Sequence, residues 1–416
     1  MSLHLFSVTH SEQGLDAVAR AARRTRGLGE VLRAVDHVEG ALVLSTCNRV
    51  DVYTDIRGHI DGIDGDRIDG GAGGETVGRV SALLSASGVR PGHHEGREAL
   101  THLFSTACGL DSMVVGEREI IGQIRRAAET AKREGCLSGP LARVVEQASL
   151  VSRQVARETH LAGDGRSVVA VALGLAEESL PPLPTCRVVL VGTGSYAGAV
   201  VAALRGRGVR EIGVHSASGR AARFADSHGL SAVDDVAFSG AVAGSDLVVC
   251  CRGNGEPALT REVVAPAVEG GRLTVLDLAI TCDVAREVAD LPGVTRIDLA
   301  QVREAAPATS ALDEELAWNI VRNGVEDFLC EERARGLDPA IVALRMHISD
   351  AVEEEVVRMT NRHAGITSDH EAERALRHLA ARLVHEPSRR AREAAAQGRS
   401  EQYLEALEMV FGIHPE

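Results

Sequence analysis

The chain has 416 residues, of which 44% are hydrophobic and 25% charged, a composition ordinary for a soluble globular protein of two or three domains. Its formal net charge of −14 argues against bulk nucleic-acid binding, although a local basic patch for one particular RNA stays open. The start "MSLHLFSVTH" lacks signal-peptide features and no apolar run reaches about 18 residues, so we expect a cytoplasmic protein without membrane segments.

The first 165 residues predict a mixed domain. Strands are expected at 3–8, 41–45 and 50–55, with a helix around 14–24. Residues 58–74 are rich in Gly and Asp, but Ile68 occupies a ligand position of the calcium-loop pattern, which favours a surface loop. Amphipathic helices follow at 96–109, 118–135 and 139–159.

Residues 166–305 predict a doubly wound α/β domain. A proline-rich break at 180–185 indicates a boundary, and strands then alternate with helices. "VVLVGTGSYAG" places Gly192, Gly194 and Ala197 in a G-x-G-x-x-A pattern between a strand and a helix, where free N–H groups suit a pyrophosphate. An ordinary glycine-rich turn is the alternative.

The second strand of this domain favours NADP over NAD. It ends in "GVHSASGRAAR", without the acid that holds the ribose hydroxyls of NAD. Ser218 and Arg220 would suit a 2′-phosphate, with a solvated helix start as the alternative.

From residue 306 onward only helices are expected. A long helix covers 313–336, and a second starts at Asp338, as N-cap, and Pro339. Two shorter helices are predicted around 376–383 and 403–411. Because these helices have little core of their own, residues 306–416 are interpreted as an oligomerisation module.

The eight cysteines include no C-x-x-C pair, so neither a zinc site nor a disulfide is expected, and we predict no metal. Cys47, in "LSTCNR", follows a buried strand, and Arg49 could lower the pKa of its thiol or bind a substrate carboxylate. From spacing, a buried structural cysteine and a nucleophile remain equally open.

A second polar segment, "CGLDSMVVGEREIIGQIRRA", spans residues 108–127. Glu119 and Gln123 are four residues apart and share one face of a helix. By itself this segment could be a solvated helix face with an N-cap at Asp111 or Ser112.

Together, "LSTCNRVDVY" and "ALTHLFSTACGLDSMVVGEREIIGQIRRA" resemble glutamyl-tRNA reductases. The resemblance covers the whole chain. It implies a multidomain α/β protein with an α+β (ferredoxin-like) catalytic domain at 1–165 and a Rossmann-type NADP domain at 166–305. An all-α dimerisation domain with a long connecting helix is implied at 306–416.

The resemblance also implies roles for individual residues. Cys47 matches the thioester-forming nucleophile, and His102, otherwise a helix-rim histidine, matches a histidine important for activity. Arg49 suits the side-chain carboxylate of glutamate. The implied substrate-binding residues are Thr46, Cys47, Asn48, Arg49, Ser112, Glu117, Arg118, Glu119 and Gln123. The implied cofactor-binding residues are Gly192, Thr193, Gly194, Ser195, Tyr196, Ala197, Ser218 and Arg220.

Three positions depart from the family pattern. Val50-Asp51 replaces the usual Thr-Glu, Arg118-Glu119 replaces Pro-Gln, and Ala197 replaces Gly. An ordinary ionised Glu119 accepts but does not donate hydrogen bonds, so its contact is the least secure.

The resulting hypothesis is NADPH-dependent reduction of glutamyl-tRNA(Glu) to glutamate-1-semialdehyde, the first step of C5-pathway tetrapyrrole (porphyrin) biosynthesis, by a homodimer. The resemblance also suggests a glutamate-1-semialdehyde aminomutase as a partner. The rivals are an NADP-dependent dehydrogenase of a small free acid and a catalytically silent NADP-binding dimer.

Overall fold

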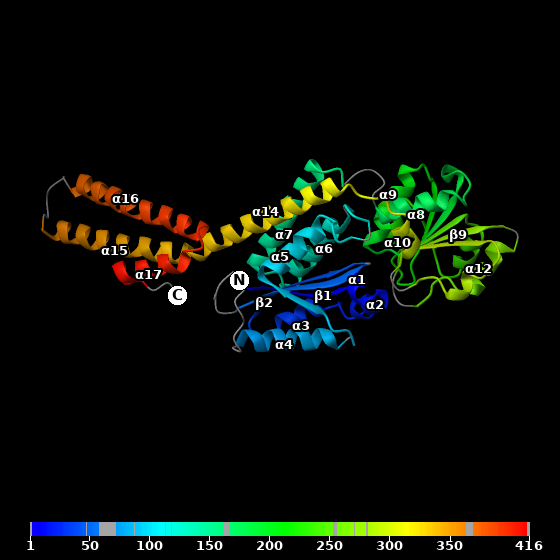
Figure 1. Cartoon of the computed structure of the whole chain (residues 1–416), viewed down its shortest axis with the longest axis horizontal. Coiled ribbons are helices and arrows are strands. Elements are labelled where there is room, and N and C mark those ends of the chain that lie inside the picture. Colours follow the sequence, from blue (N-terminus) through cyan, green and yellow to red (C-terminus); the bar gives the residue numbers. More distant parts are fainter. Residues whose placement is uncertain are drawn as a thin grey trace. The chain divides into compact units, whose positions relative to one another are not determined.

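The computed structural model describes residues 2–46, 48–57, 72–86, 88–112, 114–117, 119–161, 167–252, 256–269, 271–279, 282–362 and 369–413. The chain divides into two compact units, 1–324 and 325–416. Figure 1 shows the helices and strands in chain order. No helix in this described part of the chain is long and apolar enough to cross a membrane.

The N-terminal domain is built on a four-stranded antiparallel sheet with the order β2-β3-β1-β4. This is the ferredoxin-like order, which confirms the expected α+β architecture. Its strands are β1 (Ser2–Thr9), β2 (Val38–Ser45), β3 (Arg49–Ile56) and β4 (Gly92–Glu95). Its helices are α1 (His10–Gln13), α2 (Leu15–Ala22), α3 (Leu28–Arg33), α4 (Ala72–Ser85), α5 (Gly96–Ala107), α6 (Glu119–Arg133) and α7 (Gly139–Glu158).

Helices cover both faces of this sheet (Figure 1). On one face, side chains from α2, α3 and α4 pack against Phe6, Val8 and Val52. On the other lie α5, α6 and α7. The last begins where Ser138 Oγ accepts a hydrogen bond from the Leu141 amide. Alternation along each strand therefore gives two separate buried layers.

The second domain has a six-stranded parallel sheet with the order β10-β9-β8-β5-β6-β7. This is the doubly wound Rossmann order, as expected, and the order reverses between β5 and β8. Its strands are β5 (Arg187–Val191), β6 (Glu211–His215), β7 (Ser231–Val233), β8 (Leu247–Cys250), β9 (Leu273–Asp277) and β10 (Val294–Asp298). Its helices are α8 (Val168–Glu177), α9 (Ser195–Gly206), α10 (Ala221–His228), α11 (Phe238–Ala243), α12 (Arg261–Val268) and α13 (Leu299–Glu304), with 3-10 turns η1 (Leu183–Thr185) and η2 (Arg286–Val288).

The proline-rich stretch at 180–185 lies within this domain. Helix α8 precedes it, and buried side chains of α8, Leu183 and β5 belong to one hydrophobic core. The prolines therefore terminate a helix and start a strand of the same core.

The C-terminal region is helical, as expected, but one helix is longer than its pattern predicts. The helices are α14 (Ala311–Gly336), α15 (Asp338–Arg362), α16 (Asp369–Ala396) and α17 (Ser400–Phe411). Helix α16 continues through Pro387, whose carbonyl accepts a hydrogen bond from Tyr403 Oη at 2.9 Å. Beyond the proline, Ala391 and Ala395 are fully buried, so packing maintains the helix where local propensity would end it.

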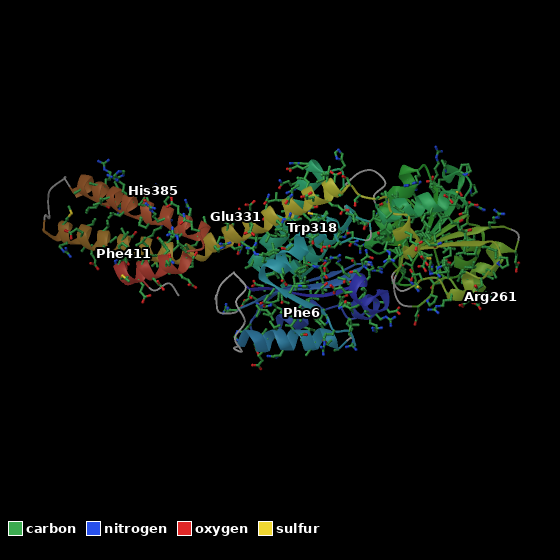
Figure 2. The ribbon with its side chains drawn as sticks, in the orientation of Figure 1. Phe6, Arg261, Trp318, Glu331, His385 and Phe411 are labelled. Atoms are coloured by element: carbon green, nitrogen blue, oxygen red, sulfur yellow. The ribbon has the colours of Figure 1, made fainter. Side chains whose placement is uncertain are left out.

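These helices also expose several large apolar side chains, including Met346 on α15 and Met409 on α17, which are 61% and 86% exposed. Figure 2 shows the side chains of this region, with Phe411 labelled on α17. Such exposure is typical of a surface that pairs with another subunit.

Candidate active site

The turn between β2 and β3 carries the cysteine motif. Cys47 lies outside the described residues, and hydrogen bonds hold the residues on either side of it. The Thr46 amide donates to the Arg49 carbonyl at 2.9 Å, and the His10 amide donates to the Asn48 carbonyl at 2.9 Å. Asn48 is 5% exposed, and its Oδ1 has no hydrogen-bond partner among the described residues. A buried acceptor without a donor is costly, and a bound ligand can supply that donor.

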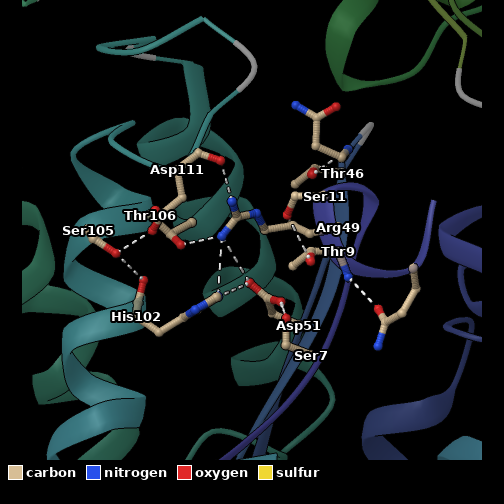
Figure 3. Close-up of polar contacts among 12 residues, drawn as sticks. Ser7, Thr9, Ser11, Thr46, Arg49, Asp51, His102, Ser105, Thr106 and Asp111 are labelled. Atoms are coloured by element: carbon tan, nitrogen blue, oxygen red, sulfur yellow. Dashed lines mark hydrogen bonds and ion pairs between the residues drawn. The ribbon is translucent and has the colours of Figure 1, made fainter. Parts of the chain in front are cut away.

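Arg49 is the centre of a polar cluster (Figure 3). It is only 4% exposed, and protein groups contact both terminal nitrogens of its guanidinium. Nη1 lies 3.2 Å from His102 Nε2 and also donates to Thr106 Oγ1, while Nη2 donates to the Asp111 carbonyl at 2.6 Å. The cluster therefore joins the cysteine turn to α5 and to the loop after it.

Asp51 completes this cluster, a role that the sequence motifs did not suggest. It is fully buried, accepts from Ser7 Oγ at 2.5 Å, and lies 3.0 Å from His102 Nε2 and 3.6 Å from Arg49 Nη1. Burial opposes its ionisation, but the hydrogen bond and charge of His102, with smaller effects of Arg49 and Ser7, hold the pKa of Asp51 below its usual value. In the sequence, the one feature that singled out Asp51 was the replacement of the usual Thr-Glu by Val50-Asp51.

Among its described residues, the 108–127 segment contacts this cluster at Asp111. The Asp111 carbonyl contacts Arg49, and the neighbouring Ser112 is partly buried. Gly116 has φ +86°, and a Cβ there would lie 2.0 Å from the Leu161 carbonyl oxygen, so the loop requires glycine to turn away. Arg118 lies outside the described residues. Gln123 follows on α6, partly buried.

Glu117 points instead toward the second domain. It is 5% exposed, and its Oε1 accepts from Tyr196 Oη at 3.1 Å and from the Val168 amide at 3.3 Å. Burial raises the pKa of Glu117, while these two hydrogen bonds act in the opposite direction. Glu117 thus binds the first turns of α8 and α9.

Glu119 is not an ordinary carboxylate. Burial, together with the charge of Glu117, raises its pKa to about 7 against the opposing effect of Arg126. At neutral pH a substantial fraction of Glu119 is therefore protonated and able to donate a hydrogen bond. The expectation that it only accepts assumed an unperturbed pKa.

The glycine-rich turn after β5 has the geometry of a dinucleotide cradle. Gly192 has φ +116°, and a Cβ there would lie 3.1 Å from the backbone of Cys251 and Arg252 at the end of β8. At Gly194, the N-cap of α9, a Cβ would meet nothing within 4 Å, so the backbone is open to a ligand. The turn lies where the strand order reverses, the position at which such sheets bind nucleotides.

The expected cofactor residues around this turn fall into two groups, one in the domain core and one in a polar chain beside the turn. Ala197 is fully buried and Tyr196 is 8% exposed, and both belong to the domain core. On the other side, Thr193 Oγ1 lies 3.4 Å from Ser216 Oγ, which lies 3.0 Å from Ser218 Oγ. Arg220 Nε donates to Ser218 Oγ at 2.8 Å. This chain of hydroxyls begins beside the turn at Thr193, passes through the buried Ser216 and ends at the exposed Ser218 and Arg220, which fit a phosphate.

Comparison with known proteins accounts for all three regions of the chain. Residues 6–159 match the model "Glutamyl-tRNAGlu reductase, N-terminal domain", residues 174–305 match "Shikimate / quinate 5-dehydrogenase", and residues 316–413 match "Glutamyl-tRNAGlu reductase, dimerisation domain".

Curated relatives match along nearly the full length. A glutamyl-tRNA reductase of Cutibacterium acnes is 43% identical over 98% of this chain and 90% of its own, and one of Micrococcus luteus is 40% identical over 99% and 93%. Among solved structures, a glutamyl-tRNA reductase from Methanopyrus kandleri covers 97% of this chain and 98% of its own at 23% identity, with a TM-score of 0.46. On the sequence matches, the chain belongs to the glutamyl-tRNA reductase family.

Proposed function

We propose that this protein reduces glutamyl-tRNA(Glu) to glutamate-1-semialdehyde with NADPH and releases tRNA, the first step of tetrapyrrole biosynthesis. The Cys47 sulfur attacks the ester carbonyl, a carbon–sulfur bond forms, and the bond to the tRNA 3′ oxygen breaks, with a proton passing to that oxygen. Reduction of the thioester breaks the carbon–sulfur bond, releases the aldehyde and regenerates the thiol.

The observation that carries this proposal is the polar cluster of Arg49, Asp51 and His102, because Arg49 follows Cys47 by two residues in the sequence. A cationic guanidinium two residues from a thiol favours its thiolate. Nη1 and one proton of Nη2 contact the protein, which leaves the other protons of the guanidinium for the side-chain carboxylate of glutamate. His102 lies close enough to exchange a proton with groups at this centre.

Asn48 supplies a further element of recognition. Its buried Oδ1 lacks a donor among the described residues. We assign Asn48 to the glutamyl-binding turn beside Arg49, with its buried side chain positioning that turn. Thr46 and Ser112 border the same turn and loop.

The residues of the second domain fit NADPH. Gly192 and Gly194 form the turn for the pyrophosphate, and Ser218 and Arg220 bind the 2′-phosphate. When bound, NADPH supplies the hydride for reduction of the acyl group. Glu117 and Tyr196 keep the cofactor helix attached to the catalytic domain, because their hydrogen bond joins the two.

The dimerisation domain supports a homodimer. We place the reaction in the cytoplasm, where charged tRNA is available and thiols stay reduced. The aldehyde product carries a free amine and is reactive, which favours direct transfer to glutamate-1-semialdehyde aminomutase.

One assay tests the proposed function. NADPH oxidation is followed with glutamyl-tRNA, with uncharged tRNA and with free glutamate. We expect turnover with glutamyl-tRNA only, and none for Cys47→Ser. Turnover with free glutamate would support a small-acid dehydrogenase. NADPH binding without any turnover would support a silent dimer, and an active Cys47→Ser would exclude the thioester.

A further inference from the structure

Two histidines and a glutamate meet at the open edge of the ferredoxin-like sheet, away from the Arg49 cluster. His4 on β1 lies opposite Glu95 on β4 in the strand register, and Phe6 lies opposite His93. Residues i and i+2 share one face, so His4, His93 and Glu95 lie together on the face of Phe6, which Figure 2 labels. Asp51, by contrast, pairs with Ser7 and lies on the other face.

The three side chains converge on one point. His4 Nδ1 lies 3.2 Å from His93 Nε2 and 3.7 Å from Glu95 Oε2, and one ligand atom of each residue lies within 4.8 Å of the others. Zinc binds histidine nitrogen and carboxylate oxygen at about 2.0–2.2 Å, so ligand atoms around one ion lie about 3–4 Å apart. The two printed separations from His4 Nδ1 fall in this range.

The surroundings of His4 favour its use as a ligand. Ser2 Oγ lies 2.9 Å from His4 Nε2, and an Nε2–H donor to this hydroxyl leaves Nδ1 with its lone pair toward His93. Metal-binding histidines commonly use their second ring nitrogen in this way. His4 is 1% exposed, so its imidazole is held in place by the surrounding protein.

A second polar group borders the cluster. Thr54 on β3 pairs with His4 of β1 and therefore lies on the same face of the sheet. Its side chain is fully buried, and its Oγ1 has no hydrogen-bond partner among the described residues. On the opposite side of His4 lies Glu95, which belongs to the edge strand β4 and whose side chain is 44% exposed. The cluster thus has a buried hydroxyl in the neighbouring strand position on one side and a partly exposed carboxylate on the other.

We propose that His4, His93 and Glu95 form a binding site for a divalent transition-metal ion such as Zn²⁺. Two imidazoles and one carboxylate are a donor set that zinc accepts, with water in the fourth position. The site joins β4 to β1. Because β4 leads directly into α5, which carries His102, a bound ion fixes the start of the helix that supports the active-site cluster.

Metal titration of the full chain tests the site, after chelator treatment and dialysis. The variants are His93→Ala, which removes an exposed ligand, and Ser2→Ala, which removes the hydrogen bond to His4. The matched control is His94→Ala, because His94 is the next residue on the same strand and its side chain points to the other face. Co²⁺ serves as a second probe, since its spectrum distinguishes nitrogen and oxygen ligands from the thiolates of the cysteines.

We expect one Zn²⁺ per chain in the wild type and in His94→Ala, an affinity at least about 100-fold weaker in His93→Ala, and about 10-fold weaker in Ser2→Ala. Hydrogen exchange on the wild type gives a readout that needs no variant: Zn²⁺ should slow exchange of the β4 amides. Equal affinity in wild type and His93→Ala, a cobalt–thiolate spectrum, or no binding by the wild type would each overturn the proposal.

Discussion

Replacing Asp51 with Asn is the most direct perturbation of the active-site cluster. The wild-type carboxylate is fully buried, accepts from Ser7 Oγ at 2.5 Å, and lies 3.0 Å from His102 Nε2. Arg49 is only 4% exposed, and its Nη1 lies 3.6 Å from Asp51 Oδ2. The variant preserves shape and one oxygen acceptor but removes the negative charge.

The magnitude follows from these contacts. Leaving a buried ion without its partner costs about 3–5 kcal/mol. Arg49 keeps the Thr106 hydroxyl and the Asp111 carbonyl, so we expect about 2–3 kcal/mol of lost stability at pH 7. Misplacement of His102 and Arg49 should lower kcat/KM for glutamyl-tRNA about 100-fold.

The stability effect has a defined pH dependence. The pKa of Asp51 is lower in the folded chain than its ordinary value of 3.8. Its ionised form therefore stabilises the fold above that value, and the contribution is lost as the pH falls through the folded pKa. The difference in denaturation midpoint between wild type and Asp51→Asn should be full at pH 7 and should shrink below about pH 4.

Asp55→Asn on the same strand is the matched control. Asp55 is 5% exposed and accepts from Ser138 Oγ at 2.8 Å, and burial raises its pKa, so a neutral side chain fits this position. We expect a stability change within about 1 kcal/mol and unchanged kcat/KM. Wild-type stability and activity in Asp51→Asn, or equal losses in both variants, would refute the role given to the cluster.

Other predictions concern the cofactor turn and Glu119. Gly192→Ala should lower both the thermal midpoint and NADPH affinity, since a Cβ there would lie 3.1 Å from backbone atoms, whereas Gly194→Ala, with open space at that position, should lose affinity alone. Fluorescence titration measures the NADPH affinity and thermal denaturation measures the midpoint of both variants. Equal thermal midpoints for Gly192→Ala and Gly194→Ala would contradict this interpretation. Arg220→Ala should weaken NADPH binding about 10-fold without changing NADH binding, and parallel losses would remove Arg220 from the 2′-phosphate site. The raised pKa of Glu119, about 7, makes the fold less stable as pH rises from about 4.5 toward 7. Glu119→Gln should therefore raise the stability measured by denaturation at pH 8, by about 1 kcal/mol after screening by solvent, and leave it unchanged at pH 5.

The fold was largely predictable because its signals are local. Apolar runs mark the strands, and the strand-turn-helix pattern around Gly192 identifies the Rossmann domain. Helix α16 is longer than the predicted 376–383, because the burial of Ala391 beyond Pro387 depends on distant contacts that no local pattern shows.

The site was predictable only in part. The motifs identified Arg49 and His102 as candidates, and their roles stay predictions, but no spacing rule joins residue 49 to residues 102 and 111. His4 and His93 likewise lie 89 residues apart, and only the pairing of β1 with β4 brings them together. A search for metal-ligand spacing along the chain therefore cannot find such a pair.

Glu117 makes contacts that its sequence motif does not indicate. The pattern groups it with substrate-binding residues, yet its Oε1 accepts from the Val168 amide and from Tyr196 Oη. Both donors lie in the first turns of helices in the cofactor domain, where helix dipoles favour a carboxylate. In the proposed reaction, acyl transfer would need the Cys47 turn, whereas reduction would need helix α9 to hold the cofactor. A single buried side chain that binds the start of α9 from within the catalytic domain couples these two requirements, because any displacement of α9 must first break a buried hydrogen bond.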